Sequence, residues 1–408
     1  MNITLIEAYF APEVFAFTHL EQDILQGLVK AGHTVRVVCP TPTRGVSKET
    51  VKAYKKIRHE SYGGIEVSRY WAPQERSNPV AKAFRYFWCN FRGNHLAKKF
   101  RDTDVILAVS TPPTQGWFVG RLAKKMNVSF VYSLQDLFPE SLVTSGICSA
   151  HSPFYKIGEW IEKKTYPLCS RIIVLSRTVE NMLIKKGVNH DKLKLISNWV
   201  DPDVVNTVPK NENALFDEYH ISKDTFNVVY AGNLGASQGP KVIYRAARLL
   251  KDNKDISFTI FGGGSGYHQM QHKIKEYHLS NVKAYPLLPV ERVPEVYSLG
   301  DVALVTCKKG VSQTAMPSKT WNIMACNTPI IASFDTDSEL AHILHTAKAG
   351  VCVEPENPEA LANAIVYAKD HAGKKNKGEA REFVMAHMSR NIGVKKYVRC
   401  IETAKREG

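Results

Sequence analysis

The stretch TAMPSKTWNIMACNTPIIAS (residues 314–333) predicts a helix followed directly by a strand. The helix is expected to open at Ser318, and the apolar segment 328–333 is expected to form the strand. Lys319 and Asn322 would then lie on the first turn of the helix. Amide groups, the positive end of the helix dipole and an ammonium group would together attract an anion there. The alternative is a surface turn in which Ser318 is only an N-cap and Lys319 is solvated.

Strand-like and helical segments alternate along the rest of the chain, with helical patterns such as 19–33 and 239–253. Such alternation predicts an α/β protein with parallel sheets covered on both faces. Eleven strands are many for one such sheet, and 408 residues exceed what one core usually supports, so two doubly wound domains are expected. The polar stretch 201–224 is the expected linker. The expected strands are 2–10, 34–40, 104–110, 129–134, 171–176, 226–232, 257–263, 281–287, 301–307, 328–333 and 350–355.

Composition indicates a soluble globular protein, with 44% hydrophobic and 23% charged residues. No apolar run approaches the roughly 18 residues that a membrane-spanning helix needs. The opening segment MNITLIEAYF lacks a basic region and a cleavage site, so it is interpreted as a strand rather than a signal peptide. The eight cysteines form no CxxC pair, which argues against a zinc site and fits a reducing cytoplasm.

The positive charge is concentrated in the first half of the chain. The net charge is +15, and residues 1–200 contain 28 Lys and Arg against 16 Asp and Glu, a net +12. A basic first half predicts an anionic partner, which is a nucleic acid, a phospholipid or a phosphorylated substrate.

Four loops of the second half carry candidate binding groups. In open parallel sheets, ligands bind at the carboxyl ends of the strands. Two glycine-rich turns, AGNLGASQGPK (231–241) and FGGGSG (261–266), follow expected strands, and their backbone amides can hold phosphate. Either turn alone is ambiguous, because many strand–helix turns contain glycine for steric reasons. PLLP (286–289) can cup a nucleobase, and the turn at Ser318 is the fourth loop.

Ordered blocks over nearly the whole chain resemble the GT-B glycosyltransferases of family 4, which are retaining enzymes that build bacterial surface polysaccharides. The DLFPES and MPSK signatures are most similar to the WbuB-type, fucosamine transferase-like branch. The blocks are APEV (11–14), GLVKAGHTVRVVCP (27–40), LQDLFPES (134–141), ISNWVDP (196–202), VVYAGNLG (228–235), FTIFGGGSG (258–266), LGDVALVTCKKG (299–310), MPSKTWNIMACNTPIIAS (316–333) and GVCVEPENPEALANAI (350–365).

The resemblance implies two Rossmann-like domains that face a central cleft. Residues 1–205 would bind the acceptor, and residues 206–381 would bind the nucleotide sugar. Residues 382–408 would form a helix that returns to the first domain. The resemblance also implies no metal and no cofactor besides the nucleotide-sugar substrate, because such enzymes stabilise the leaving diphosphate with amides and basic side chains.

The donor site implied by the resemblance departs from the family pattern at four positions. Thr314 and Asn322 match two glutamates of the family, and Asn233 and Gln238 match the arginine and lysine that clamp the diphosphate. Lys319 would then be the main cation of the catalytic site. The implied donor residues are Gly232, Asn233, Gln238, Lys241, Gly262, Gly263, Gly264, Leu287, Leu288, Thr314, Ala315, Met316, Pro317, Ser318 and Asn322.

On the acceptor side, the usual paired glycines match Phe15, Ala16 and Phe17. The segment STPPTQ (110–115) replaces a histidine that relatives often have. Asp136 is the candidate catalytic carboxylate, with a loop-bracing carboxylate as the equally weighted alternative. The acceptor or cleft residues are Phe15, Ala16, Phe17, Thr18, Thr111 and Glu140.

Residues 80–101 predict a basic amphipathic helix. Phe84, Phe87, Trp88 and Phe91 recur at helical spacing, so they share one face. Such a helix suits contact with an anionic membrane, although packing on the protein's own core is the alternative. The basic residues around this stripe are Lys82, Arg85, Arg92, Lys98, Lys99 and Arg101.

These observations predict retaining transfer of a sugar, N-acetylated amino sugars included, from a UDP-linked donor to a lipid-linked glycan at the cytoplasmic face of the membrane. A catalytically degenerate partner subunit and a GT-B-fold UDP-N-acetylglucosamine epimerase are the alternatives. Nucleic-acid binding rests on charge alone and is not expected.

Overall fold

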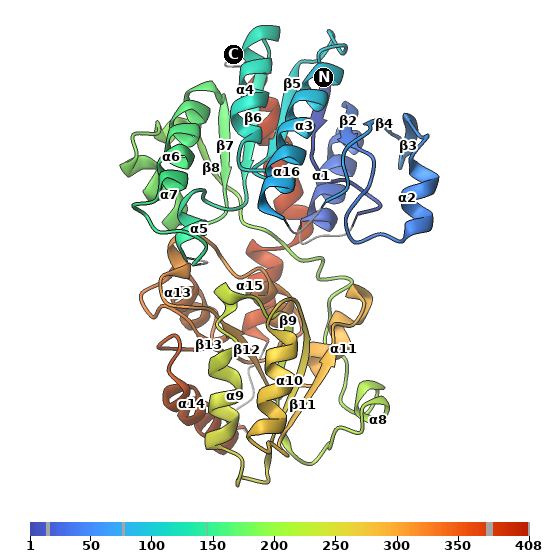
Figure 1. The fold of residues 1–408 in the computed structure, drawn as a ribbon. Coiled ribbons are helices and arrows are strands. Elements are labelled where there is room, and N and C mark those ends of the chain that lie inside the picture. Colours follow the sequence, from blue (N-terminus) through green and yellow to red (C-terminus); the bar gives the residue numbers. More distant parts are fainter. Residues whose placement is uncertain (14–16, 76–77, 145, 373–377, 407–408) are drawn as a thin grey trace. The chain divides into compact units, whose positions relative to one another are not determined.

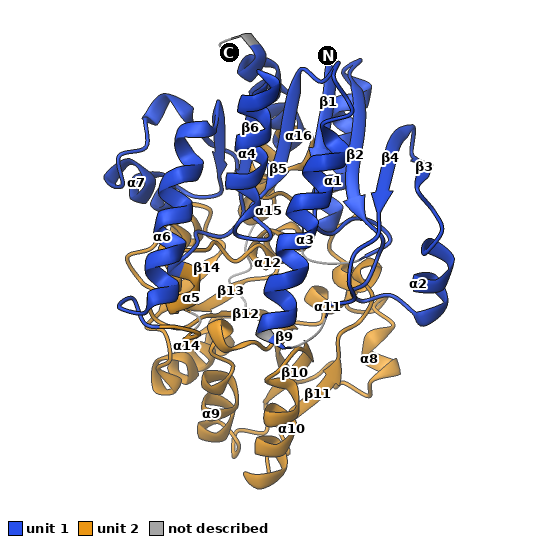
Figure 2. Ribbon diagram, turned by 45° about the horizontal axis from the view of Figure 1, so that its top comes forward, with its two compact units in different colours: residues 1–140, 149–197, 393–408 blue, residues 141–148, 198–392 orange. Residues whose placement is uncertain are grey.

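The computed structural model describes all of residues 1–408 except 14–16, 76–77, 145, 373–377 and 407–408 (Figure 1). The chain forms two compact units, which Figure 2 distinguishes by colour. Unit 1 comprises residues 1–140, 149–197 and 393–408, and unit 2 comprises residues 141–148 and 198–392. The chain therefore passes between the units near 140, 148, 197 and 392, whereas the sequence analysis placed boundaries at 205 and 381.

Unit 1 contains an eight-stranded sheet in the order β3-β4-β2-β1-β5-β6-β7-β8. All neighbouring strands are parallel except the β3–β4 hairpin. The central strands are apolar and completely buried, as the burial pattern of β5 and β6 shows, so both faces of this sheet are covered. The strands are β1 (Asn2–Ile6), β2 (Thr34–Pro40), β3 (His59–Tyr62), β4 (Ile65–Tyr70), β5 (Val105–Val109), β6 (Ser129–Leu134), β7 (Arg171–Val174) and β8 (Leu193–Leu195).

Helices cover both faces of this sheet (Figure 1). On one face, α3, α4 and α6 lie side by side, and on the other face α1 packs against α16, where Gly27 closely approaches Val394. Tyr397 of α16 shares a hydrogen bond of 2.8 Å with Ser133 of β6. The helices are α1 (Thr18–Lys30), α2 (Lys48–Tyr54), α3 (Pro79–Ala97), α4 (Gln115–Met126), α5 (Glu140–Thr144), α6 (Pro153–Thr165), α7 (Arg177–Lys185) and α16 (Arg390–Arg406).

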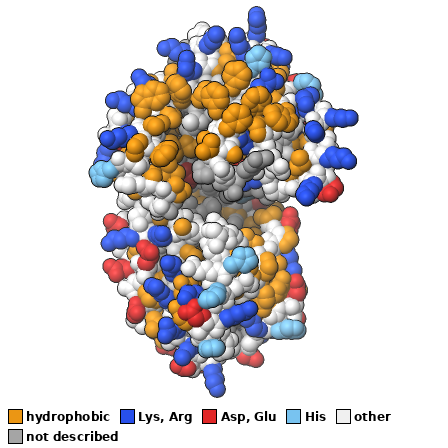
Figure 3. Space-filling model, in the orientation of Figure 1, with side chains coloured by type: hydrophobic (Ala, Val, Ile, Leu, Met, Phe, Trp, Pro, Cys, Tyr) orange, Lys and Arg blue, Asp and Glu red, His pale blue; other side chains and the backbone are white. Residues whose placement is uncertain are grey.

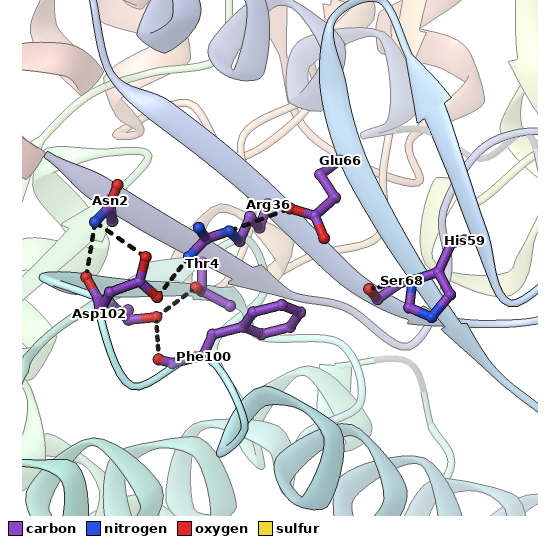
Figure 4. A network of polar contacts seen from close by, with 9 residues as sticks. Asn2, Thr4, Arg36, His59, Glu66, Ser68, Phe100 and Asp102 are labelled. Atoms are coloured by element: carbon purple, nitrogen blue, oxygen red, sulfur yellow. Dashed lines mark hydrogen bonds and ion pairs between the residues drawn. The ribbon is translucent and has the colours of Figure 1, made fainter.

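A polar network fixes the amino ends of the unit 1 strands (Figure 4). Arg36 of β2 donates from Nη1 to Asp102 at 2.7 Å and from Nε to Glu66 of β4 at 3.2 Å. Thr4 of β1 shares a hydrogen bond of 2.8 Å with Thr103, just before β5. These contacts join β1, β2, β4 and the segment before β5 at the amino ends of the strands.

Unit 2 contains a wholly parallel six-stranded sheet in the order β11-β10-β9-β12-β13-β14. Apolar clusters lie on both of its faces, one centred on Trp321 and Phe334 and the other on Ile243 and Phe258. The strands are β9 (Phe226–Asn233), β10 (Ile256–Gly263), β11 (Val282–Pro286), β12 (Val302–Thr306), β13 (Ile330–Ser333) and β14 (Gly350–Val353). The helices are α8 (Leu215–Glu218), α9 (Lys241–Leu249), α10 (Tyr267–Glu276), α11 (Val293–Ser298), α12 (Lys319–Ala325), α13 (Glu339–Thr346), α14 (Pro358–Asp370) and α15 (Glu379–His387).

The expected α/β class and the two doubly wound parallel sheets are confirmed, but three strands were missed. Strands β3 and β4 form a hairpin whose sequences, HESY and IEVSRY, are too polar to predict strands, and β8 has only three residues. The strand expected over 2–10 ends at Ile6. The single helix expected over 382–408 is instead two helices, because the chain pairs in an extended bridge at Ser389 with Val200 between α15 and α16.

The prediction that 201–224 is a polar linker was wrong. Leu215 and Phe216 of α8 are buried in the core of unit 2, and Asn213 donates a hydrogen bond of 2.7 Å to the Glu295 carbonyl. Arg381 also donates to the carbonyl of Val205 at 3.1 Å. The segment is therefore an integral part of unit 2.

Truncation of Leu215 tests this integration. Because Leu215 is completely buried, Leu215→Ala should lower the stability of unit 2 by about 2–5 kcal/mol. Val204→Ala, in the same stretch but exposed, should change it by less than about 0.5 kcal/mol. The measurement is urea unfolding followed by amide exchange in β9. Equal, small effects of both substitutions would restore the linker interpretation.

Candidate functional site

The carboxyl ends of β9, β10 and β11 bring the expected donor loops of unit 2 together. Parallel pairing places Gly232 opposite Gly262, Asn233 opposite Gly263, and Gly262 opposite Pro286. The segments 231–241, 261–266 and 286–289 therefore start at one edge of the sheet, where open parallel sheets bind ligands.

Two glycines at this edge are required by close approaches. Gly232 has a φ of 138°, and a Cβ there would lie 2.7 Å from Nζ of Lys319. Gly264 has a φ of 89°, and a Cβ there would collide with Oδ1 of Asn233. At both positions the backbone conformation favours glycine, and a neighbouring side chain lies where a Cβ atom would be.

Lys319 is the most unusual polar group at this edge. Its Nζ is buried and has no hydrogen-bond partner among the described residues. The nitrogen lies 3.9 Å from the centroid of the Tyr230 ring, which supplies a cation–π contact but no acceptor. Burial lowers the pKa of the Lys319 ammonium from 10.5 to about 8. A buried amine without an acceptor is positioned to bind an anion.

The helix that carries Lys319 differs from the expectation in its cap. Ser318 occupies the N-cap position in a helical conformation, and its side chain makes no capping hydrogen bond. The helix α12 is only seven residues long, so the ammonium, rather than the helix dipole, is the main positive group here. The helix thus opens at Ser318 as predicted, but the alternative in which the Ser318 side chain caps it is not observed.

The other expected donor residues fall into accessible and buried sets. Asn233 is exposed and donates to Oε1 of Gln238 at 3.5 Å, and Leu287 is also exposed. Thr314 is buried, and its hydroxyl donates to the Val311 carbonyl at 3.3 Å. Lys241 is exposed on the first turn of α9. Leu288, Ala315, Met316, Pro317 and Asn322 are partly buried.

The expected acceptor residues of unit 1 lie after β1, β5 and β6. Phe17 is buried, and Thr18 donates from Oγ1 to the Glu13 carbonyl at 3.4 Å. Phe15 and Ala16 lie outside the described residues. Thr111, two residues after the end of β5, is partly buried.

Of the two candidate carboxylates on the acceptor side, only Asp136 is exposed. Its backbone amide donates to Oγ of Ser110 at 3.4 Å. Glu140 forms an ion pair of 2.5 Å with Lys186 and accepts a hydrogen bond of 3.3 Å from Tyr155. Asp136 is thus the more accessible of the two.

The buried glutamates Glu7, Glu13, Glu21 and Glu162 were missed by the sequence analysis, and of these Glu7 and Glu21 have the most strongly raised pKa values. Glu7 follows β1, and Glu21 lies on α1. Desolvation raises the pKa of both groups well above the ordinary value, and the charge of Glu21 adds to the effect on Glu7. The only available signal was Glu21 on the otherwise apolar face of α1, which a surface glutamate would not occupy.

Exposed aromatic side chains extend over three helices of unit 1. Phe84, Phe87 and Phe91 of α3 are each more than half exposed, which agrees with the predicted stripe. We call the larger set the aromatic surface, and Figure 3 shows hydrophobic side chains over α3, α4 and α6 with Lys and Arg around them. Its residues are Trp71, Phe84, Phe87, Trp88, Phe91, Trp117, Phe118, Phe154, Ile157 and Trp160.

Ring contacts make this surface continuous. The ring centroids of Phe87 and Phe118 are 6.1 Å apart, those of Phe118 and Trp117 are 5.2 Å apart, and those of Trp117 and Trp160 are 5.3 Å apart. The contacts therefore link α3 to α4 and α4 to α6. The guanidinium of Arg121 lies 5.2 Å from the Trp117 ring and contributes positive charge within the surface.

One residue of the predicted stripe and one of the basic residues around it are less exposed than expected. Trp88 is only partly exposed and donates from Nε1 to the Trp71 carbonyl at 2.8 Å. Arg85 is completely buried, where its guanidinium lies 4.6 Å from the Tyr9 ring and donates to Thr43 at 3.0 Å. The inclusion of Arg85 among the surface cations was therefore wrong, because its side chain points into unit 1, towards Ala8, Tyr9 and Thr43.

The described part of the chain contains neither a candidate metal cluster nor a candidate membrane-spanning helix. No group of three or more His, Cys, Asp or Glu side chains there could hold a metal ion. None of the helices in the described ranges combines the length and apolar character that crossing a bilayer requires.

Comparison with known proteins identifies the two units. Residues 22–204 match the model "Glycosyltransferase Family 4", and residues 211–380 match the model "Glycosyl transferases group 1". The chain is a family-4-like GT-B glycosyltransferase. Together the two models cover most of both units, and they agree with the parallel sheets described above.

Individual relatives of this glycosyltransferase are distant. WbjE of Pseudomonas aeruginosa, assigned as a glycosyltransferase, is 26% identical over 80% of both chains. WcaI of Escherichia coli K12, assigned as a glycosyl transferase of colanic acid biosynthesis, is 23% identical over 90% of this chain and 91% of its own. The structure of Anabaena HepE in complex with UDP has a TM-score of 0.73 and 14% identity over 99% of this chain and 100% of HepE, which supports the fold.

Replacement of Lys319 tests whether its amine is desolvated. Because the folded-state pKa of Lys319 is lowered, the unfolded protein binds more protons between about pH 8 and 10.5, and stability rises with pH there. Lys319→Met should therefore be more stable than wild type at pH 7, by about 1–3 kcal/mol. The advantage should shrink towards pH 10.

The matched control is Lys251→Met, an exposed lysine of the same unit. It should change the free energy of unfolding by less than about 0.5 kcal/mol at either pH. Denaturant unfolding at pH 7 and pH 10 provides the measurement. An effect of Lys319→Met that is the same at both pH values would show that the amine is not desolvated.

Proposed function

We propose that this glycosyltransferase transfers a sugar, with retention of configuration, from a UDP-linked donor to a lipid-linked glycan. The reaction would belong to the synthesis of a surface polysaccharide, such as a capsule, an O-antigen or an exopolysaccharide. WcaI, named for colanic acid biosynthesis, supports this setting, and HepE, solved with UDP, supports the nucleotide. The DLFPES and MPSK signatures, which resemble the WbuB-type branch, favour an N-acetylated amino sugar as the sugar of the donor.

The observation that carries the proposal is the buried amine of Lys319. The amine faces the glycine-rich edge of unit 2, where Gly232 gives it room, and it has no acceptor among the described residues. A diphosphate there would supply oxygen atoms to the amine and favour its charged form. Desolvated charge pairs of this kind are much stronger than the same pair in water.

The remaining donor contacts follow from the positions of the loops. The amides of Asn233 and Gln238 would donate to phosphate oxygens without adding charge. Asn322, three residues after Lys319 on α12, would contact the ribose hydroxyls, and Leu287 and Leu288 would cover the base. Lys319 would then provide most of the positive charge at the leaving group.

The proposed reaction is a front-face displacement. The acceptor hydroxyl would attack the anomeric carbon on the side of the leaving group, while the bond from that carbon to the diphosphate oxygen breaks. The proton of the hydroxyl would pass to the departing diphosphate, which leaves as UDP. Asp136, the accessible carboxylate after β6, would orient the acceptor, and the enzyme would contribute orientation and charge stabilisation.

The aromatic surface supports a peripheral position on the cytoplasmic face of the membrane, where a lipid-linked acceptor resides. Exposed rings on α3, α4 and α6 form an apolar area with Arg92 and Arg121 beside the tryptophans. Interfacial tryptophans and basic residues suit the headgroup region of an anionic bilayer.

Assay with UDP-, GDP- and dTDP-sugars and a lipid-linked glycan acceptor tests the proposed function. UDP should be released, and the new linkage should keep the anomeric configuration of the donor. Lys319→Ala should reduce kcat/KM by about 30- to 1000-fold, which corresponds to about 2–4 kcal/mol of transition-state stabilisation.

A binding measurement separates charge stabilisation from a structural role of Lys319. Near pH 9, UDP binding should take up a proton in wild type, because the diphosphate restores the ammonium, and Lys319→Met should abolish the uptake. Calorimetry in two buffers with different heats of ionisation measures this proton. Lys251→Ala should match wild type in both experiments. UDP binding without turnover of any donor would indicate the degenerate partner subunit instead.

Vesicle sedimentation tests the proposed membrane contact. Wild type should bind vesicles that contain anionic lipid, and binding should fall at high salt. Replacement of Phe84, Phe87 and Phe91 with serine should weaken binding at least tenfold, since each ring contributes apolar burial.

The matched control replaces three exposed apolar side chains of unit 2, Leu249, Val351 and Tyr367, with serine. This variant should bind vesicles as wild type does. Circular dichroism checks that both variants are folded. Equal losses in the two triple variants, or no binding by wild type, would contradict the membrane contact.

A further inference from the structure

A basic pocket lies in unit 1, between the β3–β4 hairpin and the end of α3. Its volume is about 320 Å³, at the small end of the range typical of ligand sites. None of the residues that line it is acidic. The positively charged or titratable side chains that line the pocket are Arg58, His59, Arg69, Arg92, His95 and Lys99.

The carboxylates of this region are paired with Arg36, which lies outside the pocket, and with Arg69, which lines it. Glu60 of β3 accepts from Nε of Arg69 at 2.6 Å. Glu66 and Asp102 both pair with Arg36, as Figure 4 shows. These contacts remove the nearest anions from the pocket.

Three cations of the pocket consequently lack an anionic partner among the described residues. Arg58 donates from Nη1 only to the carbonyls of Lys55 and Ile57, at 3.0 and 3.1 Å. Arg92 lies 6.0 Å from the Trp88 ring, and Lys99 is exposed. Three positive side chains that converge on one concave site repel each other, so the site favours a multivalent anion.

Arg69 gives the pocket a fixed floor. The side chain of Arg69 is buried, and it donates to the carbonyls of Ala11 and Pro40 as well as to Glu60. Tyr70 is also buried, with its hydroxyl donating to the Cys89 carbonyl at 3.2 Å. The floor is therefore rigid, while the cations at the rim can adjust to a ligand.

The pocket adjoins the aromatic surface. Trp71 lines the pocket, and its ring centroid lies 5.6 Å from that of Trp88, which in turn lies 6.3 Å from Phe84. A phosphate group at the pocket would therefore lie next to side chains that suit an acyl-chain boundary.

We propose that this pocket binds a phosphate group through Arg58, Arg92 and Lys99. The ligand is a phosphomonoester or diphosphate, supplied either by a lipid headgroup or by a soluble phosphate compound. Arginine forks match phosphate oxygens in geometry, and lysine adds a point charge. The site is separate from the proposed donor site, since all of its residues belong to unit 1.

The test uses a pocket variant and a charge-matched control in the full-length chain. The pocket variant replaces Arg58, Arg92 and Lys99 with glutamine. The control replaces Lys395, Lys396 and Arg399 with glutamine, which removes the same charge from exposed positions on α16. A second pocket variant, Arg92→Gln with Lys99→Gln, keeps the backbone contacts of Arg58 in case the triple variant does not fold.

The soluble arm titrates inorganic pyrophosphate by calorimetry, with every protein also carrying Lys319→Ala so that the proposed donor site contributes nothing. The lipid arm compares vesicles that contain phosphatidic acid with phosphatidylglycerol vesicles of equal surface charge. Phosphatidic acid exposes a phosphomonoester, whereas phosphatidylglycerol has only a diester, so a preference for the first reports the pocket rather than diffuse charge.

The pocket variants should bind pyrophosphate at least tenfold more weakly than the control, or should lose a preference for phosphatidic acid that the control keeps. If the pocket variants lose pyrophosphate binding, a soluble phosphate compound is a sufficient ligand. If they lose only the preference for phosphatidic acid, the ligand is a lipid headgroup. Equal losses in the pocket variants and the control, or no binding in either arm by the protein with an unaltered pocket, would overturn the proposal. The supporting and the contradicting outcomes can both be interpreted whether or not the protein transfers a sugar.

Discussion

The parallel register of β9 with β10 is the constraint on which the candidate donor site depends. It places Gly232 beside Gly262 and Asn233 beside Gly263, so two glycine-rich turns start at the same edge. The absence of a side chain at Gly232 leaves the space that the amine of Lys319 occupies. Any residue with a Cβ at that position would displace the amine or strain the strand. Backbone pairing thus determines where the amine of Lys319 lies, and the exclusion of water around the amine determines how it interacts with an anion.

This arrangement explains how the site can differ from the family pattern and still attract an anion. In the proposed donor site, amides at Asn233 and Gln238 would stand where the family resemblance implies charged clamps, which would leave two fewer positive charges at the diphosphate. The remaining cation is desolvated, and a desolvated charge interacts more strongly with a partner than a hydrated one. In the absence of a ligand the same desolvation costs stability, because the amine is held near Tyr230 and no described residue offers it an acceptor. Stability is commonly lost in this way at functional sites.

Unit 1 has a different physical problem, which is the exposure of large apolar side chains. Aromatic rings on α3, α4 and α6 remain accessible to solvent although the sheet beneath them is fully covered. A continuous apolar area of this kind on a single chain indicates an interaction surface. Its border is basic, and part of that border is the pocket with Arg58, Arg92 and Lys99. The proposed membrane contact would place the apolar rings at the acyl boundary and the neighbouring cations at the anionic headgroups.

The sequence by itself determined the fold class, most strands and the donor loops, because these depend on local patterns. Apolar runs such as 104–110 predict buried strands, and glycines after a strand predict a turn at its carboxyl end. The same local reasoning found the ring stripe of α3. It assigned Arg85 to the surface, because residue spacing alone does not show where the buried face of a helix ends. The sequence-based reasoning also treated 201–224 as a linker, because the polar residues of this segment outnumber the few apolar residues that are buried.

Only the tertiary structure decided which distant segments meet. The rings of Trp117 and Trp160 join the α3 stripe because the strand order places α3, α4 and α6 side by side on one face. The basic pocket depends on a hairpin of polar strands that carry no strong sequence signal, and on Arg36 and Arg69, which pair with the local carboxylates. The missing acceptor at Lys319 is likewise invisible in sequence, because a hydrogen bond that is not made depends on every neighbour of the nitrogen in space.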